Sequence, residues 1–340
     1  MKQHEIAVGI LGATGVVGTE MCKVLEERNV PCTSLRLLAD RSEAGKKVIF
    51  RGKELTVEEA TDDSFDGLDI LLVAVSDTVS RRFSPVAAAK GVVVIDNSSA
   101  YRMDPEVPLI VPEVNPQDIS WHKGIIANPN CSTIIALVAV HALHQAHPIK
   151  RMIVSTYQAV SGAGINGLKE LEEQAADYAS GRPISENKVF QHQIAFNLIP
   201  HIDAFQDNGY TKEELKMLNE GRKIFHKPDL DITCTCVRVP VLRSHSESIY
   251  LEFNEKVSVE EARELISAAA GTKLVDEPDK NIYPMPLDTS NQDLVFVGRI
   301  RQDMTEENAL DLWCCGDQIR KGAATNAVQI AELIIAKERA

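Results

Sequence analysis

The sequence predicts an α/β protein with two domains, a Rossmann-like dinucleotide-binding domain and a second, α+β domain. Short apolar runs alternate with helical periodicity over the first 130 residues, and a glycine-rich turn follows the first run. Longer alternating strands dominate from about residue 152. We expect the first domain over residues 1–130, the second over 131–317, and a C-terminal helix over 318–340 that returns to the first domain.

The first third of the chain predicts a parallel sheet with helices packed on it. We expect strands at 6–11, 35–39, 69–75, 92–95 and 125–126. Helices are expected at 15–27, 78–90 and 131–144. Short buried strands joined by helices are typical of a parallel sheet that is covered on both faces.

The second part predicts an antiparallel or mixed sheet. Its strands are expected at 152–159, 232–239, 248–253, 294–300 and 308–314. Helices are expected at 166–178 and within the polar segment 203–228. The strands alternate apolar and polar residues, as strands exposed on one face do.

The charge of the chain argues against two classes of partner. The formal net charge is −13 and no run of five or six Lys/Arg is present, which disfavours nucleic acid and anionic membranes. The first 18 residues carry four glycines and do not resemble a signal peptide. Because the apolar runs are shorter than the roughly 20 residues of a bilayer span, we expect a cytoplasmic protein.

A glycine pattern predicts a dinucleotide site. Gly12, Gly15 and Gly18 are spaced three apart between a strand and a helix, where glycines let the backbone approach a pyrophosphate. A tight turn without a ligand is the alternative interpretation. After the second strand, Arg41 and Ser42 favour the 2′-phosphate of NADP, whereas the neighbouring Asp40 suits the free ribose of NAD.

Cys131 is the candidate nucleophile. It follows Asn128-Pro129-Asn130 and opens an apolar helix, whose positive end favours the thiolate. A buried structural cysteine is the alternative, and this is how we interpret Cys234 and Cys236, which share one face of a strand. His141, His144 and His147 recur every three residues along one helix and could suggest a metal site, but their position towards the helix C-terminus, which favours imidazolium, is the better explanation, so we expect no metal.

His245 and Arg238 lie in one block at the end of a predicted strand. Of the nine histidines, His245 is the best candidate base, because strand-end loops present catalytic groups. Strand alternation places Arg238 on the same face as Cys234 and Cys236. A covered arginine needs a partner, either a substrate carboxylate or a structural salt bridge.

Together, the run 128–133, the GATGVVG turn, the segment 158–164 and the block 238–245 resemble the aspartate-semialdehyde dehydrogenase family. The resemblance implies a homodimeric enzyme of lysine, threonine and methionine biosynthesis. Such an enzyme uses NADPH to reduce L-4-aspartyl phosphate to the semialdehyde and phosphate through a cysteine thioester. N-acetyl-glutamyl-phosphate reductase, glyceraldehyde-phosphate dehydrogenase and an NADP sensor without turnover are the alternatives.

The resemblance also implies a role for individual residues. Cys131 would be the nucleophile and His245 the acid/base. The substrate would contact Gln158, Glu220 and Arg238, and phosphate would contact Arg102 and Lys223. The expected NADP contacts are Gly12, Thr14, Gly15, Val16, Val17, Arg41, Ser42, Ser161, Gly162 and Gln318.

Overall fold

The computed structural model describes residues 6–339, which form two compact units. One unit contains the chain up to Asn130 together with the residues from Ala323 onward, and the other runs from Cys131 to Gly322. Gln318 therefore belongs to the second unit, although the expected C-terminal helix placed it with the first. Residues 1–5 and 340, the ends of the predicted first domain, lie outside the described residues.

The first unit is built on a seven-stranded sheet in the order β3-β4-β2-β1-β5-β6-β7. All neighbouring strands are parallel except β3 and β4. The five predicted strands are confirmed as β1, β2, β5, β6 and β7, whereas the edge strand β3 and its neighbour β4, both largely exposed, were not expected. Their bounds are β1 Ile6–Leu11, β2 Cys32–Ala39, β3 Lys47–Phe50, β4 Lys53–Glu59, β5 Ile70–Val73, β6 Val93–Asp96 and β7 Ile125–Ala127.

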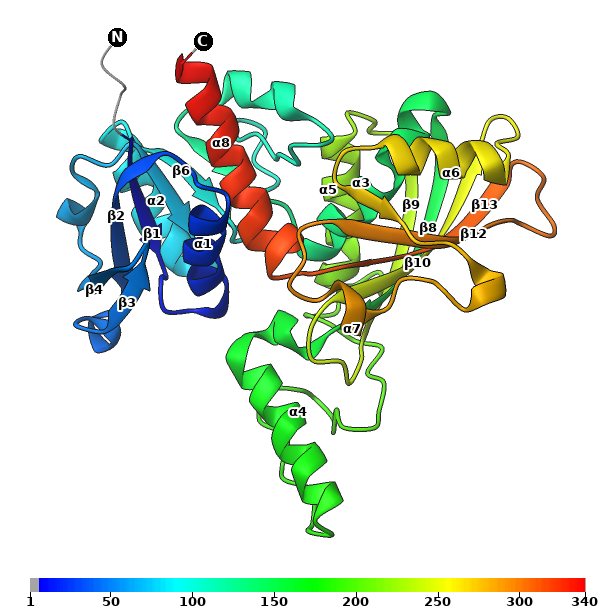
Figure 1. The fold of residues 1–340 in the computed structure, drawn as a ribbon, viewed down its shortest axis with the longest axis horizontal. Helices are drawn as coiled ribbons and strands as arrows, with labels where there is room; N and C mark the ends of the chain where they lie inside the picture. Colours follow the sequence, from blue (N-terminus) through cyan, green and yellow to red (C-terminus); the bar gives the residue numbers. More distant parts are fainter. Residues whose placement is uncertain (1–5, 340) are drawn as a thin grey trace. The chain divides into compact units, whose positions relative to one another are not determined.

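Helices cover both faces of this sheet (Figure 1). The core on one face joins α1 (Val16–Glu27) and α8 (Thr325–Arg339) to the strands, and α2 (Asp77–Ala89) packs on the opposite face. A π-helical turn at Arg320–Ala324 precedes α8, where we expected one continuous helix. The Rossmann-like class of this unit is confirmed.

The second unit is built on a six-stranded mixed sheet in the order β11-β12-β13-β10-β8-β9. The pairs β8/β9 and β11/β12 are parallel and the other pairs are antiparallel, which confirms the predicted mixed sheet. The strands are β8 Ile149–Gln158, β9 Asp231–Arg238, β10 His245–Phe253, β11 Thr272–Leu274, β12 Val295–Gln302 and β13 Ala309–Gly316.

Helices α3 (Cys131–Ala146), α5 (Lys212–Ile224) and α6 (Val259–Ala268) cover one face of the second sheet (Figure 1). The opposite face carries the half-buried rings of Tyr157, Tyr250 and Trp313. A sheet face that leaves large aromatic rings partly exposed is typical of a subunit interface.

Two further helices complete the second unit. Helix α4 (Gly164–Ala179) forms an arm with the loop that follows it, and the buried Glu170 accepts hydrogen bonds from three loop N–H groups. The short α7 (Pro286–Thr289) precedes β12. Within residues 6–339, no helix combines the length and the apolar character needed to cross a membrane.

The glycine turn between β1 and α1 leaves no room for a side chain at two positions. Gly12 has a φ of +87°, and a Cβ there would lie 2.3 Å from the carbonyl oxygen of Ala74. A Cβ on Gly18 would lie 2.1 Å from the carbonyl oxygen of Gly12. At Gly15 the nearest atom would be 3.4 Å away, an ordinary contact.

We therefore expect Gly18→Ala to lower the free energy of unfolding by about 1–3 kcal/mol, the usual cost of overpacking against a rigid neighbour. Gly15→Ala is the matched control: it loses only the N-cap preference of glycine and makes no steric clash, so its free energy of unfolding should fall less than that of Gly18→Ala. Urea unfolding of both variants without cofactor measures the difference. Equal stability of the two variants would contradict the close approach of Gly18 to Gly12.

Candidate active site

Cys131 is the first residue of α3 and the one half-buried cysteine in the chain; the other six are buried. Helix α3 is apolar on all sides, with ten buried residues, so the core holds it in place. The Sγ atom of Cys131 lies 3.5 Å from Nε2 of His245. Cys234 and Cys236 are buried on one face of β9, as predicted for small core side chains.

His245 is the first residue of β10, not part of a loop as predicted. Strand β10 begins three residues earlier than expected, because β13 pairs with it from His245 onward and β8 pairs with it from Ser246 onward. The preceding Ser244 adopts a left-handed φ of +75°, a strained conformation of the kind often found at functional sites. The hydroxyl of Ser244 is held 2.5 Å from that of Thr289.

The imidazole of His245 is fully buried and has a defined tautomer. The N–H of Ala159 donates to Nδ1 at 3.0 Å, so the ring proton of the neutral form lies on Nε2, which faces Cys131. Burial, followed by the nearby charge of Arg238, lowers the pKa of His245 to about 3. The ring is therefore uncharged near neutral pH.

Gln158 and Arg238 lie side by side at the ends of the parallel strands β8 and β9. Both are buried, and the predicted alternation that puts Arg238 on the cysteine face of β9 is confirmed. One nitrogen of the Arg238 guanidinium donates to the carbonyl oxygen of Ala159 at 2.7 Å. Burial lowers the pKa of Arg238, and the charges of Glu213 and Cys131 oppose this shift.

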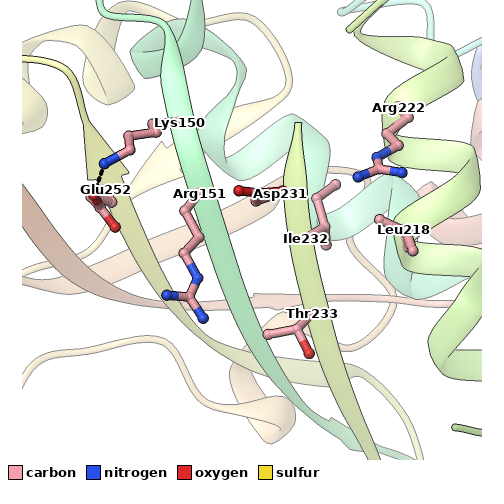
Figure 2. Close-up of a pocket in the computed structure, with 8 residues that line it drawn as sticks. All are labelled: Lys150, Arg151, Leu218, Arg222, Asp231, Ile232, Thr233 and Glu252. Atoms are coloured by element: carbon pink, nitrogen blue, oxygen red, sulfur yellow. Dashed lines mark hydrogen bonds and ion pairs between the residues drawn. The ribbon is translucent and has the colours of Figure 1, made fainter. Parts of the chain in front are cut away.

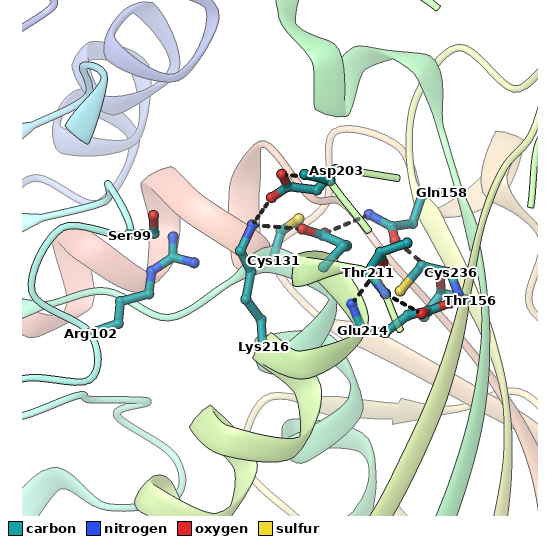
Figure 3. Close-up of polar contacts among 12 residues, drawn as sticks. Ser99, Arg102, Cys131, Thr156, Gln158, Asp203, Thr211, Glu214, Lys216 and Cys236 are labelled. Atoms are coloured by element: carbon teal, nitrogen blue, oxygen red, sulfur yellow. Dashed lines mark hydrogen bonds and ion pairs between the residues drawn. The ribbon is translucent and has the colours of Figure 1, made fainter. Parts of the chain in front are cut away.

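Two residues that sequence analysis missed join this cluster from the start of α5. Gln158 Nε2 donates to Oε1 of Glu213 at 3.1 Å, and Lys216 Nζ lies 2.8 Å from the other carboxylate oxygen. Figure 3 shows Gln158, Lys216 and Cys131 in this region. The capping box of Thr211 and Glu214 marks the helix start in the sequence, and it is the signal that locates this turn.

The structure corrects our expectation for Glu220 and Lys223. Glu214 accepts a hydrogen bond from the N–H of Cys236, so α5 begins beside the Arg238 end of β9. Gly221 instead packs against Ile232, six residues before Arg238, which is about 20 Å along an extended strand. Glu220 and Lys223 thus lie at the far end of the helix, because α5 runs antiparallel to β9.

A cavity of 470 Å³ lined by polar residues lies at that far end (Figure 2). It contains several charged side chains but no cysteine or histidine, and its Lys150 already pairs with Glu252. It therefore lacks the groups that acyl transfer needs. Its lining residues are Lys150, Arg151, Leu218, Arg222, Asp231, Ile232, Thr233 and Glu252.

The first unit holds a cleft of 670 Å³ beside the glycine turn. Gly12, Asp40 and Arg41 line it, as does Arg82 of α2, which sequence analysis missed. The Asp40 carboxylate turns back and accepts from the N–H of Ser42 at 2.9 Å and from its hydroxyl at 2.8 Å. The close-packed glycines, which let a phosphate approach the backbone, and the two arginines, which offer positive charge, fit the phosphates of a dinucleotide.

The predicted cofactor residues of the second unit pack around His245. Gln318 donates to the hydroxyl of Ser161 and accepts from the N–H of Ser244 at 2.8 Å. A Cβ on Gly162 would lie 2.8 Å from the guanidinium of Arg238 and 3.3 Å from the ring of His245. These residues therefore shape the site, whether or not they also contact a cofactor.

Arg102, the predicted phosphate ligand of the first unit, is buried and held by backbone. Its Nε donates to the carbonyl oxygen of Asn128 at 3.0 Å, and a terminal nitrogen donates to that of Asn97 at 2.7 Å. These carbonyl partners fix the orientation of the guanidinium. Such an arginine suits an anionic ligand.

Comparison with known proteins agrees with this geometry. Residues 7–122 match the family model described as "Semialdehyde dehydrogenase, NAD binding domain", and residues 140–321 match "Semialdehyde dehydrogenase, dimerisation domain". Proteins named aspartate-semialdehyde dehydrogenase from Synechocystis and Aquifex aeolicus are 51% and 52% identical. The Synechocystis match covers 97% of both chains; the Aquifex match covers 96% of this chain and 97% of its own.

A solved structure shows the same fold. The crystal structure of aspartate semialdehyde dehydrogenase II from Vibrio cholerae, complexed with ASA, has a TM-score of 0.95 and 44% identity. The match covers 98% of this chain and 99% of that one. The resemblance inferred from the motifs is confirmed, and the chain belongs to the aspartate-semialdehyde dehydrogenase family.

Proposed function

We propose that this chain catalyses the reversible, NADPH-dependent reduction of L-4-aspartyl phosphate to L-aspartate 4-semialdehyde and phosphate. The observation that carries the proposal is the 3.5 Å approach of the half-buried Cys131 to a neutral His245, beside Gln158 and Arg238. The matched relatives bear the name of this activity, so N-acetyl-glutamyl-phosphate reduction is not favoured. A sensor without turnover would have no use for the cysteine–histidine pair.

Cys131 supports the chemistry as a nucleophile. Its thiolate attacks the acyl carbon of aspartyl phosphate, the bond to the phosphate oxygen breaks, and a thioester forms. When bound, the dinucleotide supplies the hydride that reduces this thioester. Nε2 of His245 is the atom that gives a proton to the substrate oxygen or takes one from it, since Nδ1 is held by Ala159.

The buried charges support a division of roles within the substrate site. Arg238 suits the α-carboxylate, because its guanidinium is covered and anchored on a carbonyl rather than on an acid. Glu213 takes the role expected of Glu220 and binds the α-ammonium. Lys216 takes the role expected of Lys223 and binds phosphate, for which Arg102 stays a predicted ligand.

NADP is the proposed cofactor and a homodimer the proposed assembly. Arg41 and Arg82 both line the cleft of the first unit and suit a 2′-phosphate. The family model names residues 140–321 a dimerisation domain, and the helix-free face of the second sheet carries Tyr157, Tyr250 and Trp313. Cytoplasmic location stays a prediction.

The activity is tested by following NADP reduction with aspartate semialdehyde in the presence of inorganic phosphate. We expect turnover that requires phosphate, because phosphate releases the acyl group from Cys131. Cys131→Ser should retain less than about 1% of this rate while its stability and NADP binding stay unchanged, because serine is not ionised near neutral pH. Higher residual activity would disprove the nucleophile.

Iodoacetamide labelling followed by mass spectrometry gives the control for the same assignment. Cys131 should be alkylated first, because the other six cysteines are buried. Under the same conditions Cys131→Ser should take up no label.

His245 should stay uncharged over the whole working range of pH. A pKa near 3 means that the imidazole remains neutral above about pH 4, whereas an ordinary histidine is half-protonated near pH 6.5. Nitrogen-15 NMR of labelled histidine, assigned by difference from His245→Asn, should show a protonated Nε2 and a bare Nδ1 from pH 5.5 to 8. A titration midpoint between pH 6 and 7 would refute this environment.

Arg41→Ala should lower the preference for NADP over NAD by about tenfold or more, mainly through a higher KM for NADP. This is the size of a charge-assisted hydrogen bond to phosphate, about 1.5–3 kcal/mol. Lys46→Ala is the matched control, because this nearby cation pairs with Glu43 and does not line the cleft. A preference for NAD in the unaltered protein would mean that Asp40 faces the ribose.

A further inference from the structure

Lys216 lies between two carboxylates, Glu213 and Asp203. Its Nζ is 2.8 Å from Oε2 of Glu213 and 3.1 Å from Oδ2 of Asp203 (Figure 3). Burial alone would lower the pKa of Lys216, but the two acids raise it above its ordinary value. The side chain of Lys216 is only 24% exposed, so both ion pairs are partly shielded from water.

Glu213 cannot serve Lys216 and a substrate ammonium equally well. Its Oε1 already accepts the hydrogen bond from Gln158, and its Oε2 is the oxygen that holds Lys216. An α-ammonium that docks on Glu213 therefore competes with Lys216. A half-buried lysine that lost its carboxylate in this way would be costly unless another acid remained.

Asp203 is positioned to be that second acid. It has a left-handed φ of +67°, and its Oδ1 accepts from the N–H of Ala204 at 2.8 Å, which leaves Oδ2 for Lys216. The carbonyl oxygen of Ala204 accepts from the N–H of Lys212 at 2.9 Å, at the start of α5. The backbone next to Asp203 is therefore attached to the start of the helix that carries Lys216.

We infer that Asp203 is a positioning residue that sets the preference for substrates with an α-ammonium group. When the substrate ammonium pairs with Glu213, Lys216 keeps its ion pair with Asp203. The substrate thus replaces Lys216 on Glu213 without leaving the lysine unpaired. The inference rests on the proposed function, because it takes the α-ammonium of aspartate semialdehyde as the competing cation.

Asp203→Asn keeps the shape of the side chain and removes its charge. Lys216 then depends on Glu213 alone, and a substrate ammonium must displace it at greater cost. A substrate without the amino group makes no demand on Glu213 and should be unaffected. The substitution should therefore change selectivity, whereas a purely structural defect would affect both substrates equally.

The test compares L-aspartate 4-semialdehyde with succinate semialdehyde, which has the same chain without the amino group, at saturating phosphate and NADP. In Asp203→Asn we expect the ratio of the two kcat/KM values to fall about tenfold, the size of one charge-assisted hydrogen bond. The fall should come from a higher KM for the amino substrate. Asp207→Asn is the matched control, because Asp207 is an exposed acid of the same loop.

The background Lys216→Met separates the exchange from direct attraction of the substrate by Asp203. Without a lysine to hold, Asp203→Asn should alter the selectivity ratio no further. A tenfold fall that persists in this background, or an equal loss for both substrates, would overturn the inference. If the unaltered protein does not turn over aspartate semialdehyde, the proposed function fails instead.

Discussion

The backbone of a single residue, Ala159, orients both the imidazole and the guanidinium of the active site. Its N–H donates to His245 at 3.0 Å and its carbonyl oxygen accepts from Arg238 at 2.7 Å. Both side chains are buried, and a buried polar group without a hydrogen bond is costly. The two bonds to Ala159 offset part of that cost and fix the orientation of each side chain. A Cβ on Gly162 would lie 2.8 Å from a terminal nitrogen of Arg238, so a side chain there would require the guanidinium to move.

The same logic explains how a protein with a net charge of −13 keeps cations available for an anionic substrate. Arg238 and Arg102 each donate to backbone carbonyl oxygens, which restrain the guanidinium. Lys216 is held differently, between Asp203 and Glu213. If a substrate ammonium occupies Glu213, Asp203 keeps Lys216 paired, so the proposed exchange leaves no unpaired lysine beside the site.

The errors of sequence analysis have identifiable physical causes. Sequence analysis places His245 in a loop. In the structure it begins a strand, because a strand that is hydrogen-bonded on both sides can begin at polar residues, and no local signal in the sequence shows that pairing. Glu220 and Lys223 were preferred to Glu213 and Lys216, although the pairs lie seven residues apart on almost the same face of one helix. Only the direction in which α5 crosses β9 tells which end of that face meets Arg238.

The sequence by itself determined what depends on short-range rules. Periodicity defined the two sheets, the glycine turn marked the dinucleotide cleft, a polar break before an apolar helix identified Cys131, and strand alternation placed Arg238 on a buried face. The tertiary structure alone decided which acid meets Gln158, which backbone group fixes the tautomer of His245, and that Asp203 shares Lys216 with Glu213. The residues in these contacts are 13 to 86 positions apart in the sequence, and no local preference encodes such pairs. The choice of Glu213 over Glu220 depends in addition on which of two similar turns of α5 meets the site.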